Sequence, residues 1–379
     1  MTHPDAPDTI PATRGAIQSL KAYYEKNERG IAVLFFVGGF VFDIVTLGRI
    51  DSWFAIGQQG LYLVLIAMAL THMFLEQSGP APEPDGMVVL KRWYYRSRTA
   101  IVHFLFGSLL SLYTIFFFMS SSVLVSFGFL AFLVLLLVAN EFSRVKSLGL
   151  PVKFAILSLC VLSFFSYVVP IVVGSIGLVV FLISMAVGSL PVVGIGAWAR
   201  TRGPQLSRLA ARQILKPLGI VLLGFLLLYY FRVIPPVPLS IPFIGVYHAV
   251  ERTDEGYRLS HERPAWRFWH NGDQEFVARP GDKDYVFFRV FSPTRFSDQV
   301  LMRWYWKDEA RGWTLQDSIP IKIVGGREQG FRGYGFKSKY QPGAWKVQIE
   351  TADSREIGRV YFDLQLGPES QRSFVIDIE

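Results

Sequence analysis

Four side chains that could act as metal ligands lie on three predicted membrane helices. His72 and Glu76 are four residues apart, which places them on one helix face, while His103 and Glu141 lie on the next two apolar runs. The spans inferred below put all four near the cytoplasmic surface. Imidazole and carboxylate groups suit zinc or iron. However, no tight motif joins the four, and polar residues are common at a membrane surface, so ordinary interfacial side chains are the preferred interpretation.

Two charged residues lie where a membrane would make them costly. Asp43 is toward the outer end of the first apolar run, and Arg232 is close to the outer end of the last one. Because an ionisable group at membrane depth is costly unless paired, we predict an ion pair between Asp43 and Arg232. Arg49 fits less well, since six helical residues turn it about 240° from Asp43. A shallow position that reaches interfacial water, or a proton-relay role for Asp43, is the alternative.

Tryptophan is frequent in the C-terminal part. Trp304 and Trp306 share a predicted strand face, and Trp345 is in phase with the apolar positions of its own strand, so these three are expected in a core. Trp266 and Trp269 follow no such phase. Exposed tryptophans are frequent in binding sites, so we predict a ligand site for a glycan or a protein at Trp266 and Trp269. Packing into the core is the competing interpretation.

Common catalytic signatures are missing from the sequence. It has no Gly-rich phosphate loop, no His-Glu-x-x-His, no Gly-x-Ser-x-Gly and no Cys-x-x-Cys. Cys160 is the only cysteine, which excludes an intrachain disulfide and a cysteine metal cluster. We therefore predict no catalytic residues and no cofactor. A membrane-embedded enzyme can assemble its site from scattered residues, so that class stays open as an alternative.

Composition and charge point to a membrane protein. Of the 379 residues, 51% are hydrophobic, and the formal net charge of +8 lies entirely in residues 1–250. Residues 251–379 carry as many acidic as basic residues. A nucleic-acid-binding protein would place a basic face on its soluble domain, so we expect no nucleic-acid partner. The bias of basic residues toward the cytoplasmic side of a bilayer accounts for the excess.

The apolar runs define the predicted membrane helices, since a span needs about 20 apolar residues. The 45 residues 154–198 contain no charged residue, which is enough for two spans, and Pro170, Gly174 and Gly177 mark the turn between them. Seven spans are predicted: Ile31–Leu47, Phe54–Leu75, Ala100–Met119, Val123–Ala139, two within Phe154–Trp198, and Leu218–Ile234.

The distribution of basic residues predicts the orientation. Lys and Arg gather before the first, third, fifth and seventh spans, whereas the opposite loops carry only Arg49. By the positive-inside rule, residues 1–30 are cytoplasmic and the C-terminal domain lies outside. The N-terminal residues are mostly polar and no small-residue cleavage site follows the first apolar run, so we expect no cleavable signal peptide.

Beyond the last span the pattern changes from helix to strand. Residues 235–243 are rich in proline and are predicted to form a stiff spacer that holds the following domain away from the bilayer. In residues 244–379 apolar residues recur with a period of two, and Asn271-Gly272 predicts a β-hairpin. Seven to nine short strands at this spacing predict an immunoglobulin-like, antiparallel β-sandwich. The fold class is thus a seven-helix membrane domain followed by an all-β domain.

Two stretches resemble a bacterial family whose C-terminal part is the domain of unknown function 2914. They are Gly39–Asp51 at the end of the first apolar run, and a C-terminal pattern that combines Arg303–Trp306, Gly330–Arg332, Pro342–Val347 and Ile357–Phe362. The resemblance implies a multi-pass bacterial membrane protein with a small β domain. It implies no reaction, cofactor or active site.

These features favour a non-enzymatic protein of the bacterial inner membrane. Its β domain would lie in the periplasm and bind an envelope protein or glycan, as a sensor, scaffold or assembly factor, while the bilayer surrounds its helices. The alternatives are a small-solute transporter and a membrane-embedded enzyme acting on lipid or envelope precursors. A transporter should carry polar residues at mid-depth, whereas the predicted spans are almost purely apolar there.

Overall fold

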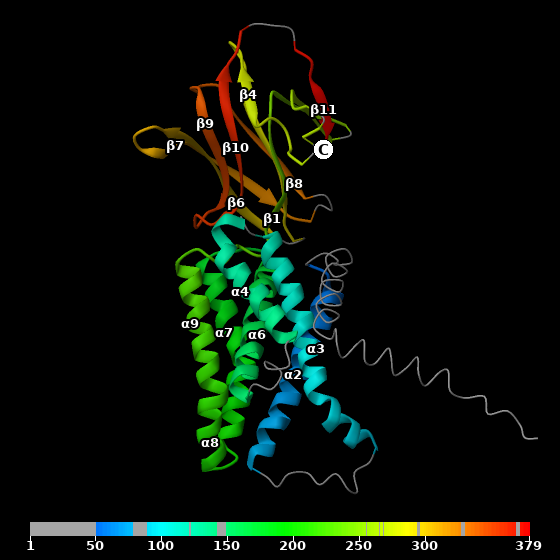
Figure 1. Ribbon diagram of the computed structural model, residues 1–379. Coiled ribbons are helices and arrows are strands. Elements are labelled where there is room, and N and C mark those ends of the chain that lie inside the picture. Colours follow the sequence, from blue (N-terminus) through cyan, green and yellow to red (C-terminus); the bar gives the residue numbers. More distant parts are fainter. Residues whose placement is uncertain are drawn as a thin grey trace, which may run out of the picture. The chain divides into compact units, whose positions relative to one another are not determined.

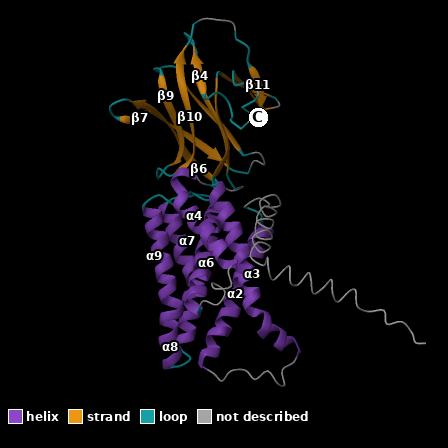
Figure 2. Ribbon diagram, in the orientation of Figure 1, coloured by secondary structure: helices purple, strands orange, loops and turns teal. Residues whose placement is uncertain are grey.

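The computed structural model describes residues 51–78, 89–120, 123–141, 149–254, 256–264, 266–267, 269–293, 296–326, 330–368 and 372–379. Helices occupy the described residues up to 230, and strands occupy those from 240 onward (Figures 1 and 2). The predicted cytoplasmic segment 1–30 and the predicted first span, Ile31–Leu47, lie outside the described residues.

The helical half consists of long apolar helices joined by short segments. They are α2 (Trp53–Leu75), the 3₁₀ turn η1 (Glu76–Ser78), α3 (Val89–Met119), α4 (Val123–Glu141), α6 (Leu150–Val173), α7 (Leu178–Arg200), α8 (Pro204–Ala210), the π-helical turn η2 (Ala211–Leu215) and α9 (Lys216–Tyr230).

Five helices among the described residues are long and apolar enough to cross a membrane: Trp53–Leu75, Ser97–Met119, Leu150–Val173, Leu178–Arg200 and Pro204–Tyr230. The predicted span Val123–Ala139 forms α4, but its described apolar section, Phe127–Ala139, is shorter. The described residues therefore do not support the count of seven spans.

The charge-free stretch divides as predicted. Helix α6 contains Pro170 and ends at Gly174, which has a φ of 78°, and α7 begins after Gly177, which has a φ of 131°. Glycine adopts these positive angles without a Cβ clash, so the chain reverses here. The last span begins earlier than predicted, because Arg208 on α8, Arg212 on η2 and Lys216 on α9 lie in helix rather than in a loop.

The proline-rich junction differs from its prediction. Residues Ile234–Ser240 are all buried, and the Leu239 N–H donates to the Pro236 carbonyl at 3.0 Å. The predicted extended spacer is therefore wrong. Proline favours a fixed turn as readily as an extended chain, and here the apolar side chains have a surface on which to pack.

The β domain also begins before its predicted boundary at residue 244. Its strands are β1 (Ser240–Tyr247), β2 (Ala249–Thr253), β3 (Gly256–His261), β4 (Glu275–Ala278), β5 (Asp284–Phe291), β6 (Ser297–Asp308), β7 (Gly312–Val324), β8 (Phe331–Lys337), β9 (Gly343–Thr351), β10 (Glu356–Leu366) and β11 (Val375–Ile378). Leu239 is fully buried in the core of this domain.

The strands form two main sheets and a small third one. The orders are β1-β5-β8, β4-β10-β9-β6-β7 and β11-β3-β2. One apolar core contains residues of the first two sheets, including Val286 and Phe288 of β5 and Trp304, Trp345 and Phe362 of the larger sheet. The expected two-sheet domain is present, but β4 pairs with β10 in parallel, so the sandwich is not wholly antiparallel. An immunoglobulin-like topology stays a prediction.

Specific contacts join the β9–β10 turn to the end of α9. The Arg355 guanidinium donates to the carbonyl oxygens of Tyr229 at 2.8 Å and Ile234 at 3.0 Å, and it lies 3.3 Å from the Tyr229 ring centroid. Asp353 accepts from Arg355 Nε at 2.8 Å. At the α6–α7 turn, the Ile176 side chain packs against the β core. The β domain is therefore attached at more points than the chain junction.

Candidate functional site

The two tryptophans predicted to bind a ligand lie on the loop between β3 and β4. Trp266 is 61% exposed and Trp269 58% exposed, which contradicts packing into the core. Their ring centroids are 5.7 Å apart at an interplanar angle of 63°. The Arg267 guanidinium lies 4.9 Å from the Trp266 ring centroid and forms an ion pair with Glu275 at 3.0 Å. The loop therefore presents a compact Trp–Arg–Trp surface.

Local hydrogen bonds shape this loop. The Arg267 N–H donates to the Pro264 carbonyl at 3.1 Å, the His270 N–H donates to the Arg267 carbonyl at 3.2 Å, and the Arg263 side chain donates to that same Arg267 carbonyl at 3.3 Å. Such turns fix the backbone before a ligand arrives, which lowers the entropic cost of binding.

The predicted Asn271-Gly272 hairpin is wrong, because this pair packs against β1. Gly272 has a φ of 65° and forms an isolated parallel bridge with Val246. A Cβ on Gly272 would lie 2.1 Å from the Val246 carbonyl oxygen, so only glycine fits. The next N–H, that of Asp273, donates to the same oxygen at 2.8 Å. The glycine is thus required for close packing against β1, which is distant in the sequence, and not for a hairpin turn.

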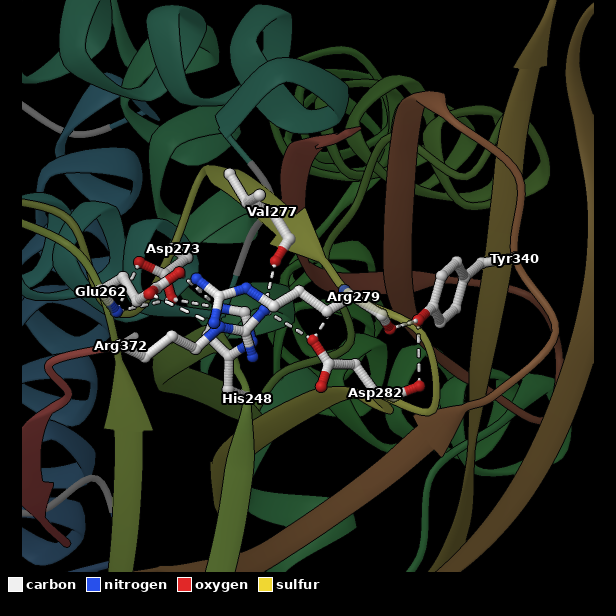
Figure 3. A network of polar contacts seen from close by, with 8 residues as sticks. All are labelled: His248, Glu262, Asp273, Val277, Arg279, Asp282, Tyr340 and Arg372. Carbon is white, nitrogen blue, oxygen red and sulfur yellow. Dashed lines mark hydrogen bonds and ion pairs between the residues drawn. The ribbon is translucent and has the colours of Figure 1, made fainter. Parts of the chain in front are cut away.

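A buried polar network closes the base of the loop (Figure 3). Glu262 and Asp273 lie at the two ends of the tryptophan loop. The Glu262 N–H donates to both Asp273 carboxylate oxygens, at 3.1 and 3.0 Å. His248, which follows β1, places Nε2 3.4 Å from a Glu262 oxygen and 3.5 Å from an Asp273 oxygen. The His248 ring stacks on Phe276 with centroids 4.1 Å apart.

Arg372 links this network to the C-terminal segment. Its guanidinium donates to the Val277 carbonyl at 2.8 Å and to the Asp282 carboxylate at 2.7 Å, and it lies 3.4 Å from His248 Nδ1 (Figure 3). Its Nε is 3.6 Å from Glu262. The Tyr340 hydroxyl donates to the Asp282 carbonyl at 3.0 Å. Five separate segments are thereby held together.

The electrostatics of the network follow from burial. Burial raises the pKa of Asp273 to about 6. Burial, followed by the nearby Arg372 charge, lowers the pKa of His248 to about 4. His248 is therefore neutral at pH 7. The side chains of His248 and Asp273 are each only 3% exposed, so a substrate does not reach them. The network braces the tryptophan loop at its two ends.

The proposed metal-binding side chains do not meet as a group in the described residues. The Glu76 carboxylate accepts from Arg98 at 2.6 Å and lies 3.5 Å from His72 Nδ1, while His103 is buried on α3. No set of three metal-ligating residues in the described ranges is arranged to hold an ion. Glu141 ends α4, and its side chain is outside the described residues. Glu76 is therefore neutralised by an arginine.

The proposed Asp43–Arg232 pair stays a prediction, because Asp43 lies outside the described residues. Arg232 is exposed in the turn that follows α9 and has a φ of 60°. Burial raises the pKa of Glu350 on β9, and the nearby charge of Arg232 opposes part of this rise. Arg232 thus lies beyond the end of its helix and near the β domain.

Sequence reasoning missed two kinds of polar residue. His248, Asp273 and Arg372 are far apart in the sequence, and no motif connects them. In the helices, the Tyr167 hydroxyl donates to Gln59 Oε1 at 2.6 Å, and both side chains are buried. The pair Gln58-Gln59 on α2 was a signal for this second contact, since a polar group inside an apolar bundle needs a partner.

Comparison with known families finds a match in the β domain. Residues 297–364 match the family described as "Protein of unknown function (DUF2914)". This segment begins at β6 and includes β7, β8, β9 and most of β10. A comparison with curated proteins finds no match.

Similarity to solved structures is slight. A β-glucosidase from Listeria innocua in complex with glucose is 9% identical over 24% of this chain and 15% of its own, with a TM-score of 0.19. The alkylpurine DNA glycosylase AlkC of Pseudomonas fluorescens, bound to DNA containing an abasic site analog, is 11% identical over 80% of this chain and 99% of its own, with a TM-score of 0.21. The chain thus spans a small part of the β-glucosidase, and at these TM-scores neither likeness indicates a shared fold.

Proposed function

We propose that this is a multi-pass protein of the bacterial inner membrane whose periplasmic β domain binds a protein partner through Trp266, Arg267 and Trp269. The observation that carries the proposal is the exposure of both tryptophans on a braced loop. Tryptophan and arginine are the residue types most enriched among the residues that dominate protein interfaces. Two adjacent exposed indole rings are unfavourably hydrated, and a partner that covers them removes this cost.

The membrane location and the orientation belong to the same proposal. The five long apolar helices support insertion into a bilayer. The gathering of Lys and Arg in alternate loops favours a cytoplasmic side for those loops and, with it, a periplasmic position for the β domain. A cysteine introduced at position 322, which is exposed and outside the tryptophan loop, tests the orientation, because Cys160 is the only native cysteine and can be replaced by alanine. A membrane-impermeant maleimide should label Lys322→Cys in intact spheroplasts. Labelling only after lysis would contradict the orientation.

Binding can be tested by photo-crosslinking in living cells. A benzophenone amino acid at position 269 should form an adduct of one defined mass, because the partner covers this side chain. Tyr334 of β8, which is 43% exposed, provides a matched aromatic control position and should not form that adduct. In addition, Trp266→Ala should abolish the adduct at position 269 without changing the melting temperature. No protein adduct at position 269, or the same adduct at position 334, would reject the proposal.

A further inference from the structure

A second group of aromatic residues lies on the face of the larger sheet that points away from the apolar core. Tyr305 of β6, Lys346 of β9 and Tyr361 of β10 are direct neighbours in register across three strands. Trp313 of β7 joins them, with its ring centroid 5.8 Å from that of Tyr361. We call these four residues the outer-face cluster. All of them lie within the matched segment 297–364.

Lys346 is the unusual member of the outer-face cluster. It is only 8% exposed, although lysine is rarely buried without a partner. Its Nζ lies 4.5 Å from the Tyr305 ring centroid and 5.0 Å from that of Trp313. Among the residues that the structure describes, no hydrogen-bond or ion-pair partner lies beside this amine. Burial lowers the pKa of Lys346.

Two neighbouring arginines on the same face are already paired with carboxylates. Arg303 pairs with Glu350 at 3.0 Å, and Arg359 forms an ion pair with Glu356. The Arg359 guanidinium also donates to the Tyr361 hydroxyl at 2.6 Å. Lys307 and Lys322 are also cations on this face, but both are exposed, whereas Lys346 lies beside the aromatic rings, where an incoming anion can engage it without breaking an existing pair. The aromatic rings beside its Nζ stabilise it in the absence of that anion.

The position in the sheet restricts what kind of ligand fits. Strands β6, β9 and β10 each have a hydrogen-bonded neighbour on both sides, so their backbone groups are not free to pair with an added peptide strand. Contacts must come from side chains. Trp313 is 37% exposed and Tyr361 41% exposed, which leaves ring surface for the C–H groups of a sugar. A carboxylate on that sugar would complement the lysine.

We propose that the outer-face cluster binds an acidic saccharide, with Lys346 Nζ donating to its carboxylate and Trp313 and Tyr361 packing against its ring. The site is separate from the Trp266 and Trp269 loop and does not rest on the function proposed for that loop. No covalent step is involved.

The wild-type chain gives the first test. We would titrate the full chain, in a detergent without a sugar head group, with trigalacturonic acid and with the matching neutral galactose trisaccharide, using isothermal titration calorimetry. The acidic trisaccharide should bind at least tenfold more tightly than the neutral one. Equal affinities would overturn the proposal, as would the absence of any binding. Tighter binding of a triglutamate peptide than of trigalacturonic acid would assign the surface to an acidic peptide and would also overturn it.

Variants then locate the binding. Lys346→Met should weaken trigalacturonic acid binding at least tenfold, whereas Lys322→Met, which removes an exposed charge from β7, should leave it unchanged. Lys346→Arg keeps the charge and should keep measurable binding, which provides a readout if the methionine variant does not fold. Trp269→Ala should have no effect on this ligand. Loss of binding in Trp269→Ala, or equal losses in Lys346→Met and Lys322→Met, would refute the assignment.

Discussion

Replacing Arg372 by methionine should destabilise the β domain and release the tryptophan loop. Methionine preserves much of the apolar stem but removes the hydrogen bonds to the Val277 carbonyl at 2.8 Å and to Asp282 at 2.7 Å. It also leaves Glu262 and Asp282 without their shared cation. The side chain of Arg372 is 11% exposed, so water does not fully replace these contacts.

The magnitude follows from these contacts. A hydrogen bond to a charged group contributes about 1.5–3 kcal/mol, so the two short ones give about 3–6 kcal/mol. The carboxylates are 28% exposed in Glu262 and 24% in Asp282, and partial solvation after the substitution reduces the loss to about 3 kcal/mol. For a domain of this size, that corresponds to a fall of about 10 °C in melting temperature. Arg372→Lys keeps the charge but not the forked geometry, so we expect an intermediate value.

The assay is thermal unfolding of the full chain in detergent, followed by tryptophan emission, since Trp304 and Trp345 are buried in the β core. Arg258→Met is the matched control, because Arg258 lies on β3 and is exposed. Limited proteolysis should cut residues 262–274 faster in Arg372→Met than in the control. If Arg372→Met melts within 1 °C of Arg258→Met, the network does not brace the loop and the reasoning fails.

Three further predictions follow from other contacts. Asp273 has its pKa raised by burial, so its stabilising protonated form is lost as pH rises through about 6, whereas the neutral form of His248 is lost as pH falls through about 4. Between pH 6 and 4, acidification should therefore lower the melting temperature of Asp273→Asn relative to that of the wild type. It should raise the melting temperature of His248→Gln relative to that of the wild type. If both differences changed in the same direction with pH, this reasoning would be contradicted. A fragment that starts at Leu239 should be more stable to urea than one that starts at Gly245, because only the longer one keeps Leu239 and the whole of β1, and equal midpoints would show that these residues add nothing. Tyr167→Phe should lower the melting temperature of the helical part by leaving Gln59 without its donor, and Gln59→Leu in the same chain should restore it, which a double-mutant cycle would check.

Patterns within one element determined much of this fold from the sequence. The charge-free stretch and its Pro170, Gly174 and Gly177 predicted where α6 and α7 separate, because helix length and turn chemistry are local properties. The period of two correctly predicted that Trp304 and Trp345 lie in the core, since alternate side chains of a strand face opposite sides. The exposure of Trp266 and Trp269 was likewise predicted, from their lack of phase with any core face.

Only the tertiary structure decided the remaining features, because they depend on segments that are far apart in the sequence. Gly272 serves a close approach to β1 instead of a hairpin, and the proline junction is buried because apolar surfaces are available to cover it. His248 meets Arg372 across 124 positions, a contact that no local propensity encodes. Lys346 lies on the strand face opposite Trp345, but its burial under aromatic rings arises from side chains of neighbouring strands. Local patterns assign a residue to a face, whereas long-range packing determines what that face touches.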